Sequence, residues 1–114
     1  MNELHITEKL VTMIDIEGAD RLDPISVVLE NFEPGKGRVT IRCYAQSWAL
    51  NAYWGAMSGR SVEQFLMDCH PEYVMGCLAW GRQPVKKKDE AYFVRVVEAV
   101  QQALRQRAAA QVIA

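Results

Sequence analysis

The chain has 114 residues, of which 50% are hydrophobic and 24% are charged, with a formal net charge of −1. This composition predicts one folded domain and excludes a disordered chain. Three cysteines cannot all pair, and no apolar segment of a secretory signal follows Met1. No apolar run approaches the ~18 residues that a membrane-spanning helix needs. We therefore expect a protein with reduced thiols in a cytoplasm and no membrane partner.

The first third of the chain predicts two strands. Residues 4–16 alternate loosely between two sides and indicate a strand, although Thr7 could instead begin a short capped helix. Residues 25–32 indicate a second strand, because Ile25, Val27 and Leu29 recur at a period of two.

Residues 33–37, EPGKG, carry the strongest turn signal. Proline fixes φ for the first corner of the turn, and the following glycine supplies the positive φ that a type II turn requires. Because a strand is expected on each side, we predict a β-hairpin. A phosphate-binding loop is the alternative, but the sequence lacks both the GxxxxGK(S/T) spacing and a helical pattern after Gly37.

Strand patterning is clearest over residues 38–54. One predicted strand places Val39, Ile41 and Cys43 in the core and turns the other side outward, with Arg38, Thr40, Arg42 and Tyr44. The side chains of a second predicted strand alternate between two sides. One side carries Trp48, Leu50, Ala52 and Trp54, and the other carries Ala49, Asn51 and Tyr53. A helix capped by Ser47 is the alternative for this second segment.

Three helices are predicted in the second half. Ser61 begins the first in a capping box with Gln64, and Pro71 begins the second. Asp89 caps a long third helix that is expected to end near Arg107, with residues 108–114 as a frayed tail. The prediction is thus a single α+β domain over residues 1–114. It has an antiparallel sheet of three to four strands followed by three helices, and the long C-terminal helix packs on the sheet.

The sequence contains no catalytic or metal-binding pattern. Cys69, His70 and Cys77 lack the CxxC spacing of structural zinc sites. Adjacent residues such as Cys69 and His70 point in different directions on a helix, so they do not form a nucleophile–base pair. We expect no catalytic residues, no metal and no cofactor.

A candidate protein-binding surface is carried by the segment that is rich in Trp, Tyr and Arg, the residue types enriched in binding hot spots. Its candidates are Arg38, Arg42, Tyr44, Trp48, Tyr53 and Trp54. About half of the aromatic side chains are expected to lie in the core instead. The same set could stack single-stranded nucleic acid, but a pI near 6.1 argues against a dedicated nucleic-acid binder.

A homodimer is predicted from the long third helix, because a short sheet is not expected to cover its whole apolar face. The dimer candidates on that face are Phe93, Val97, Val100 and Leu104. Closed two-fold dimers are the commonest soluble oligomers. A monomer whose helix packs on its own sheet is the alternative.

Three strings across residues 22–69 resemble a known family: LDPISVVLENFEPGKG, GRVTIRCYAQSWALNAYWGAM and GRSVEQFLMDC. They are similar to small accessory proteins of enterobacterial lambdoid phages and prophages. The resemblance implies a phage-encoded protein of the bacterial cytoplasm and implies no reaction. With the absence of a catalytic pattern, it predicts a non-enzymatic protein that binds a host or phage protein. A module that binds single-stranded nucleic acid and an enzyme of unidentified class are the alternatives.

Overall fold

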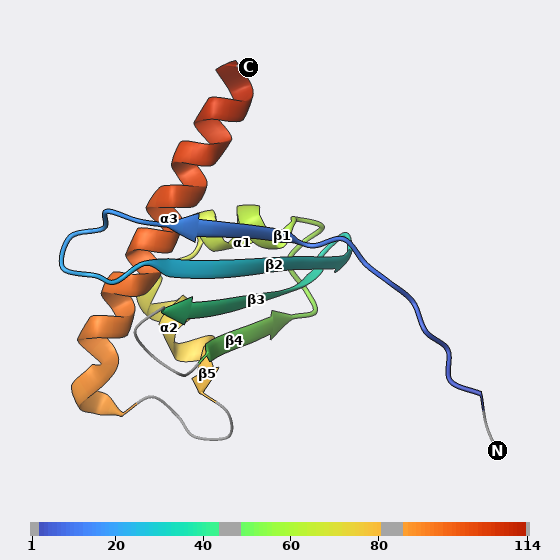
Figure 1. Cartoon of the computed structure of the whole chain (residues 1–114), viewed down its shortest axis with the longest axis horizontal. Helices are drawn as coiled ribbons and strands as arrows, with labels where there is room; N and C mark the ends of the chain where they lie inside the picture. Colours follow the sequence, from blue (N-terminus) through green and yellow to red (C-terminus); the bar gives the residue numbers. More distant parts are fainter. Residues whose placement is uncertain (1–2, 44–48, 81–85, 114) are drawn as a thin grey trace.

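The computed structural model describes residues 3–43, 49–80 and 86–113, which form two layers, with a sheet in front of helices in Figure 1. Four long strands come first: β1 (Thr12–Ile16), β2 (Ile25–Glu33), β3 (Lys36–Cys43) and β4 (Ala49–Trp54). They are followed by the helices α1 (Val62–Asp68), α2 (Pro71–Cys77) and α3 (Glu90–Ile113). A two-residue strand β5 (Ala79–Trp80) and a 3-10 turn η1 (Lys87–Asp89) lie between α2 and α3. The predicted α+β class is confirmed.

The sheet is antiparallel, and its strand order β1-β2-β3-β4-β5 follows the chain. The predicted turn closes the β2–β3 hairpin, where Glu33 pairs with Lys36 and Gly35 has a φ of +85°. Gly35 also accepts a hydrogen bond from the Met57 N–H over 3.0 Å. This hairpin end therefore anchors the loop that leads into α1.

The hydrophobic core lies between the sheet and the helices. The alternation predicted for the described parts of β3 and β4 is confirmed, because the inward side chains are buried, as are those of β2. These inward residues are Ile25, Val27, Leu29, Val39, Ile41, Cys43, Leu50, Ala52 and Trp54. The predicted second strand is thus confirmed from Ala49 onward, where the alternative helix does not form, whereas Tyr44, Ser47 and Trp48 lie outside the described residues.

The structure corrects two expectations about α3. Its apolar face is covered by the chain itself, since Phe93, Val97, Val100 and Leu104 are all buried in the core. These four dimer candidates are therefore not available to a second copy. The helix also continues to Ile113 instead of ending near Arg107, and its last turns extend past the β1 edge of the sheet (Figure 1).

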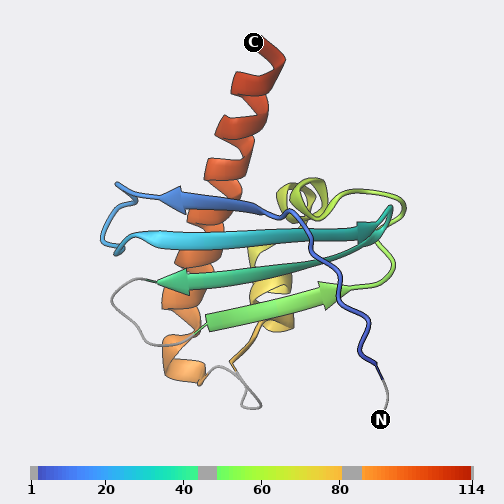
Figure 2. The ribbon, with the colours of Figure 1, turned by 45° about the vertical axis from the view of Figure 1, so that its right-hand side comes forward.

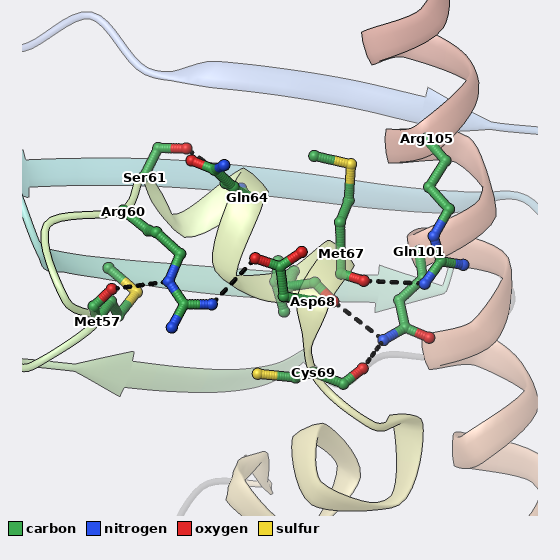
Figure 3. Close-up of polar contacts among 10 residues, drawn as sticks. Met57, Arg60, Ser61, Gln64, Met67, Asp68, Cys69, Gln101 and Arg105 are labelled. Atoms are coloured by element: carbon green, nitrogen blue, oxygen red, sulfur yellow. Dashed lines mark hydrogen bonds and ion pairs between the residues drawn. The ribbon is translucent and has the colours of Figure 1, made fainter.

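Polar contacts join α1 to α3 at the end of α1 (Figure 3). The buried Gln101 amide donates to the backbone oxygens of Leu66 over 3.0 Å and Cys69 over 2.7 Å. Arg105 donates to the Met67 oxygen over 2.9 Å. The last carbonyls of a helix have no partner within it, so these side chains satisfy groups that α1 leaves open.

The predicted starts of the first two helices are confirmed. The Ser61 hydroxyl accepts a hydrogen bond from the Gln64 N–H, and His70 Nδ1 accepts one from the Glu72 N–H before Pro71. Helix α3 begins at Glu90, directly after η1. Among the helices that the structure describes, none has the length and apolar character to cross a lipid bilayer.

The N-terminal prediction is only partly correct. The strand expected over residues 4–16 begins at Thr12, and the alternative helix near Thr7 does not form. Residues 3–11, which we call the arm, run away from the body without regular secondary structure (Figures 1 and 2). Isolated extended segments lack hydrogen-bond partners, so strand patterning alone does not place them in a sheet.

Candidate functional site

The candidate site is the open face of the sheet, defined as the side of β1–β4 that α1, α2 and α3 do not cover. In both ribbon views the helices lie behind the strands and this face is turned outward (Figures 1 and 2). Successive side chains of a strand point to opposite faces, so the open face is formed by the alternate residues that the core does not use. They are Met13, Asp15, Ser26, Val28, Glu30, Phe32, Arg38, Thr40, Arg42, Ala49, Asn51 and Tyr53.

Aromatic and charged side chains meet at one end of this face, in a group that we call the Phe32 cluster: Lys9, Glu30, Phe32, Arg38 and Tyr53. The rings of Phe32 and Tyr53 lie 6.0 Å apart and are 37% and 58% exposed. Lys9 Nζ and Arg38 Cζ lie 4.9 and 5.4 Å from the Phe32 ring centroid. Cations at this distance from an aromatic face are attracted to it, so the exposed rings are held in place by their neighbours.

A bidentate ion pair orders the cluster. Arg38 Nε and Nη2 donate to the two carboxylate oxygens of Glu30 over 2.8 and 3.0 Å. The hydrogen bond from Arg38 lowers the pKa of the Glu30 carboxyl, and its bond to Glu30 raises the pKa of Arg38. The two partners face each other directly, since Glu30 and Arg38 are opposite residues of β2 and β3. Both groups therefore stay charged at neutral pH.

The charges of the open face nearly cancel. At the hairpin end, Lys36 Nζ lies 2.7 Å from Glu33, and this hydrogen bond raises the pKa of Lys36. The cations on or beside the face are Lys9, Lys36, Arg38 and Arg42, and the carboxylates are Asp15, Glu30 and Glu33. The face thus presents mixed charges around aromatic rings, instead of one strong sign.

Arg42 lies at the other end of the open face. Its Nη2 donates to Ser26 Oγ over 3.4 Å, across the β2–β3 pair. Ser26 is only 1% exposed although it belongs to this face. Arg42 itself and Met13 of β1 are also exposed, so the Phe32 cluster is distinguished by its pair of accessible aromatic rings.

The structure separates the predicted binding residues. Arg38, Arg42 and Tyr53 share the open face, whereas Trp54 points into the core and packs on Phe65 with ring centroids 5.1 Å apart. The remaining two candidates, Tyr44 and Trp48, lie outside the described residues. Trp54 thus contributes to stability and not to the surface, in line with the expectation that some of these aromatics are core.

Sequence reasoning missed three members of the cluster, Lys9, Glu30 and Phe32. The signal for Phe32 was available, because it falls on the side of its strand opposite Ile25, Val27 and Leu29, and the hairpin brings it near Tyr53. Lys9 had no such signal. Its position depends on where the chain leaves the sheet.

The thiols of Cys43 and Cys69 are poorly suited to nucleophilic chemistry. Burial raises the pKa of both Cys43 and Cys69, which favours the protonated form. Tyr92 Oη donates to Cys43 Sγ over 3.8 Å, and burial together with this contact raises the pKa of Tyr92 to about 12. The residues that the structure describes contain no group of three or more His, Cys, Asp or Glu placed to hold a metal ion.

Fold and site together define a small two-layer α+β domain with one uncovered sheet face. The family model Phage_phiTE_072, described as a phage family, matches residues 4–90, and the chain belongs to this family of phage proteins. The match covers the four long strands, α1 and α2, and ends where α3 begins. The phage association expected from the resemblance is thereby confirmed. No curated protein and no solved structure matches the chain.

Proposed function

We propose that the protein is an accessory protein of an enterobacterial lambdoid phage or prophage. It acts in the bacterial cytoplasm by binding a host or phage protein through the open face, without catalysing a reaction. The observation that supports this most is the exposed Phe32–Tyr53 pair beside Arg38. Aromatic and arginine side chains supply most hot spots of protein interfaces.

A single-stranded nucleic acid is the second candidate partner, because exposed rings beside cations can stack bases. Affinity for nucleic acid depends mainly on cations that neutralise phosphates. On this face Arg38 is engaged by Glu30, and Lys36 is engaged by Glu33. The paired cations favour a protein surface, where mixed charges around an aromatic centre set the orientation of the partner.

Affinity capture from phage-infected bacterial lysate tests the proposal, with wild type, Tyr53→Ala and Tyr73→Ala as baits. Tyr73 is the matched control, because it is a tyrosine of similar exposure, 50% against 58%, and lies on α2 instead of the open face. A partner that uses the open face is captured by wild type and Tyr73→Ala and is lost with Tyr53→Ala. With the purified partner, Tyr53→Ala should weaken the affinity by about 10–100-fold.

Two results contradict the proposal. A partner that binds both tyrosine variants equally well places the interface elsewhere on the molecule. Failure to capture any protein, together with tight binding of labelled single-stranded DNA at near-physiological salt, makes the nucleic acid the partner. The DNA measurement uses fluorescence anisotropy across a salt series, because phosphate contacts give a steep salt dependence.

A further inference from the structure

The arm exposes three large apolar side chains to solvent. Leu4, Ile6 and Leu10 are 84%, 83% and 103% exposed. Exposing several large apolar side chains in one segment is costly in water, and such surfaces mark interaction sites. The arm leads directly into β1, and at Lys9 it still lies beside Phe32 of β2.

The alternation of β1 continues into the arm. Ile14 and Ile16 lie on the helix side of β1 and pack against the core. Leu4, Ile6 and Leu10 occupy even positions like these two isoleucines, so an extended arm would turn them to the helix side as well. Glu8 would share the helix side, and the other side would carry His5, Thr7, Lys9 and Val11.

β1 is an edge strand, so its outer side offers backbone groups to another strand. On the helix side, α3 crosses this edge and continues beyond it (Figures 1 and 2). A groove of about 350 Å³ lies between the end of β1 and α3. Its lining is partly apolar, from Ile16, Ala19, Ala99 and Ala103, and partly polar, from Glu17, Asp20, Gln102 and Gln106. Within the part of the chain that the structure describes, the molecule thus has an unpaired strand edge at β1, with a groove between the end of this strand and α3.

We propose that the arm of a second copy pairs antiparallel with the outer edge of β1, in a closed dimer whose two-fold axis passes through Leu10. This register sets Leu4 opposite Ile16 and Ile6 opposite Ile14, and places Leu4 at the groove under α3. Among registers that keep the even positions on the helix side, it alone puts Leu4, Ile6 and Leu10 all opposite apolar residues; it also sets Glu8 opposite Thr12. The two-fold axis is perpendicular to the sheet, so both open faces lie on the same side of the dimer.

The proposal does not rest on the function of the open face, which this dimer leaves accessible. It replaces the α3 dimer expected from the sequence, because that apolar face is buried within one chain. The occupant is a second copy because one segment carries both halves of the interface, the apolar arm and the edge strand. This arrangement satisfies the self-complementarity that a two-fold interface requires.

Light scattering and sedimentation of the full chain, from about 1 to about 100 µM, test the proposal. Wild type should show the dimer mass as the concentration rises. The double variant Leu4→Glu, Ile6→Glu should raise the dissociation constant by about 100-fold or more, since each substitution occurs twice in the dimer. The control His5→Glu, Thr7→Glu makes the same change in charge on the opposite side of the arm and should leave the dimer intact.

The register is tested by cross-linking. Opposite residues of antiparallel strands have Cβ atoms about 4.5–5.5 Å apart, so two copies of Leu10→Cys on the axis are within disulfide reach. Two copies of Leu4→Cys would be about 40 Å apart. Under oxidising conditions Leu10→Cys should therefore give a disulfide-linked dimer on a non-reducing gel. Wild type and Leu4→Cys should give no disulfide-linked dimer. These two samples also control for disulfides formed by the native cysteines Cys43, Cys69 and Cys77.

Three outcomes overturn the proposal. A wild-type monomer mass over the whole concentration range leaves no dimer to explain. Equal loss of the dimer in both double variants removes the preference for one side of the arm. A dimeric wild type whose Leu10→Cys variant does not cross-link, or cross-links no better than Leu4→Cys, excludes this register.

Discussion

Replacing Gln101 with leucine should destabilise the domain strongly, although no catalytic or binding group is altered. The side chain is 2% exposed, and its amide donates to the oxygens of both Leu66 and Cys69. Leucine has nearly the same size but donates nothing, so two hydrogen bonds are lost. The Leu66 carbonyl then stays buried, and the Cys69 carbonyl partly buried, without this donor. Each net hydrogen bond contributes about 1 kcal/mol, and each unpaired buried acceptor costs about 1–3 kcal/mol. Because the larger side-chain apolar surface offsets part of this, we expect a loss of about 2–4 kcal/mol.

Urea unfolding followed by circular dichroism at one fixed protein concentration measures the free energy of unfolding. Gln111→Leu is the matched control, since it is the same substitution in the same helix at an exposed position. It should change stability by less than about 0.5 kcal/mol. For Gln101→Leu the midpoint of thermal unfolding should fall by about 10 °C. A loss below about 1 kcal/mol, or one no larger than that of Gln111→Leu, would refute the view that Gln101 holds α1 on α3.

Two further predictions concern the sheet and the cluster. Gly37→Ala should destabilise the domain by about 1–3 kcal/mol. A Cβ at this position would lie 2.8 Å from the backbone oxygen of Glu30 and 2.9 Å from Val62 Cβ. In contrast, a Cβ at Gly76 in α2 would have no atom within 4 Å, so Gly76→Ala should raise stability by about 0.5–1 kcal/mol in the same urea assay. If the two alanine substitutions changed the free energy of unfolding equally, the difference in free space around the two glycines would not explain their effects. The pKa of Glu30 is held below its ordinary 4.5 by Arg38, so its stabilisation is present above that value and is lost as the pH falls through the lower folded-state pKa. Glu30→Gln should therefore lose less stability than wild type on acidification, and identical acid profiles would show that the pair contributes nothing.

Much of the fold was predictable because its signals are local. The alternation of Val39, Ile41 and Cys43 follows from the period of a strand, and the EPGKG turn follows from the fixed φ of Pro34 and the positive φ of Gly35. Caps such as Ser61 act on the next turn of the chain. These features depend on residues a few positions apart, so the sequence contains the whole cause.

The candidate site was only partly predictable. The sequence placed Arg38 outward and set Tyr53 on the side of its strand opposite Trp54. It did not assemble the cluster, because Lys9, Phe32 and Tyr53 come from separate segments that meet only in the folded chain. It also treated Tyr53 and Trp54 as one set of binding candidates. Alternation sends them to opposite faces, and the helices then decide which face is covered.

By itself the sequence determined the strand faces, the hairpin, the helix starts and the α+β class, since each is set by backbone preferences within a short segment. The tertiary structure alone decided that the apolar face of α3 is covered up to Leu104, that Gln101 is buried to close the end of α1, and that the arm leaves the sheet before Thr12. Those outcomes depend on the size of the sheet and on contacts between segments more than thirty residues apart. Burial is a property of what packs on a residue, and no local pattern contains it.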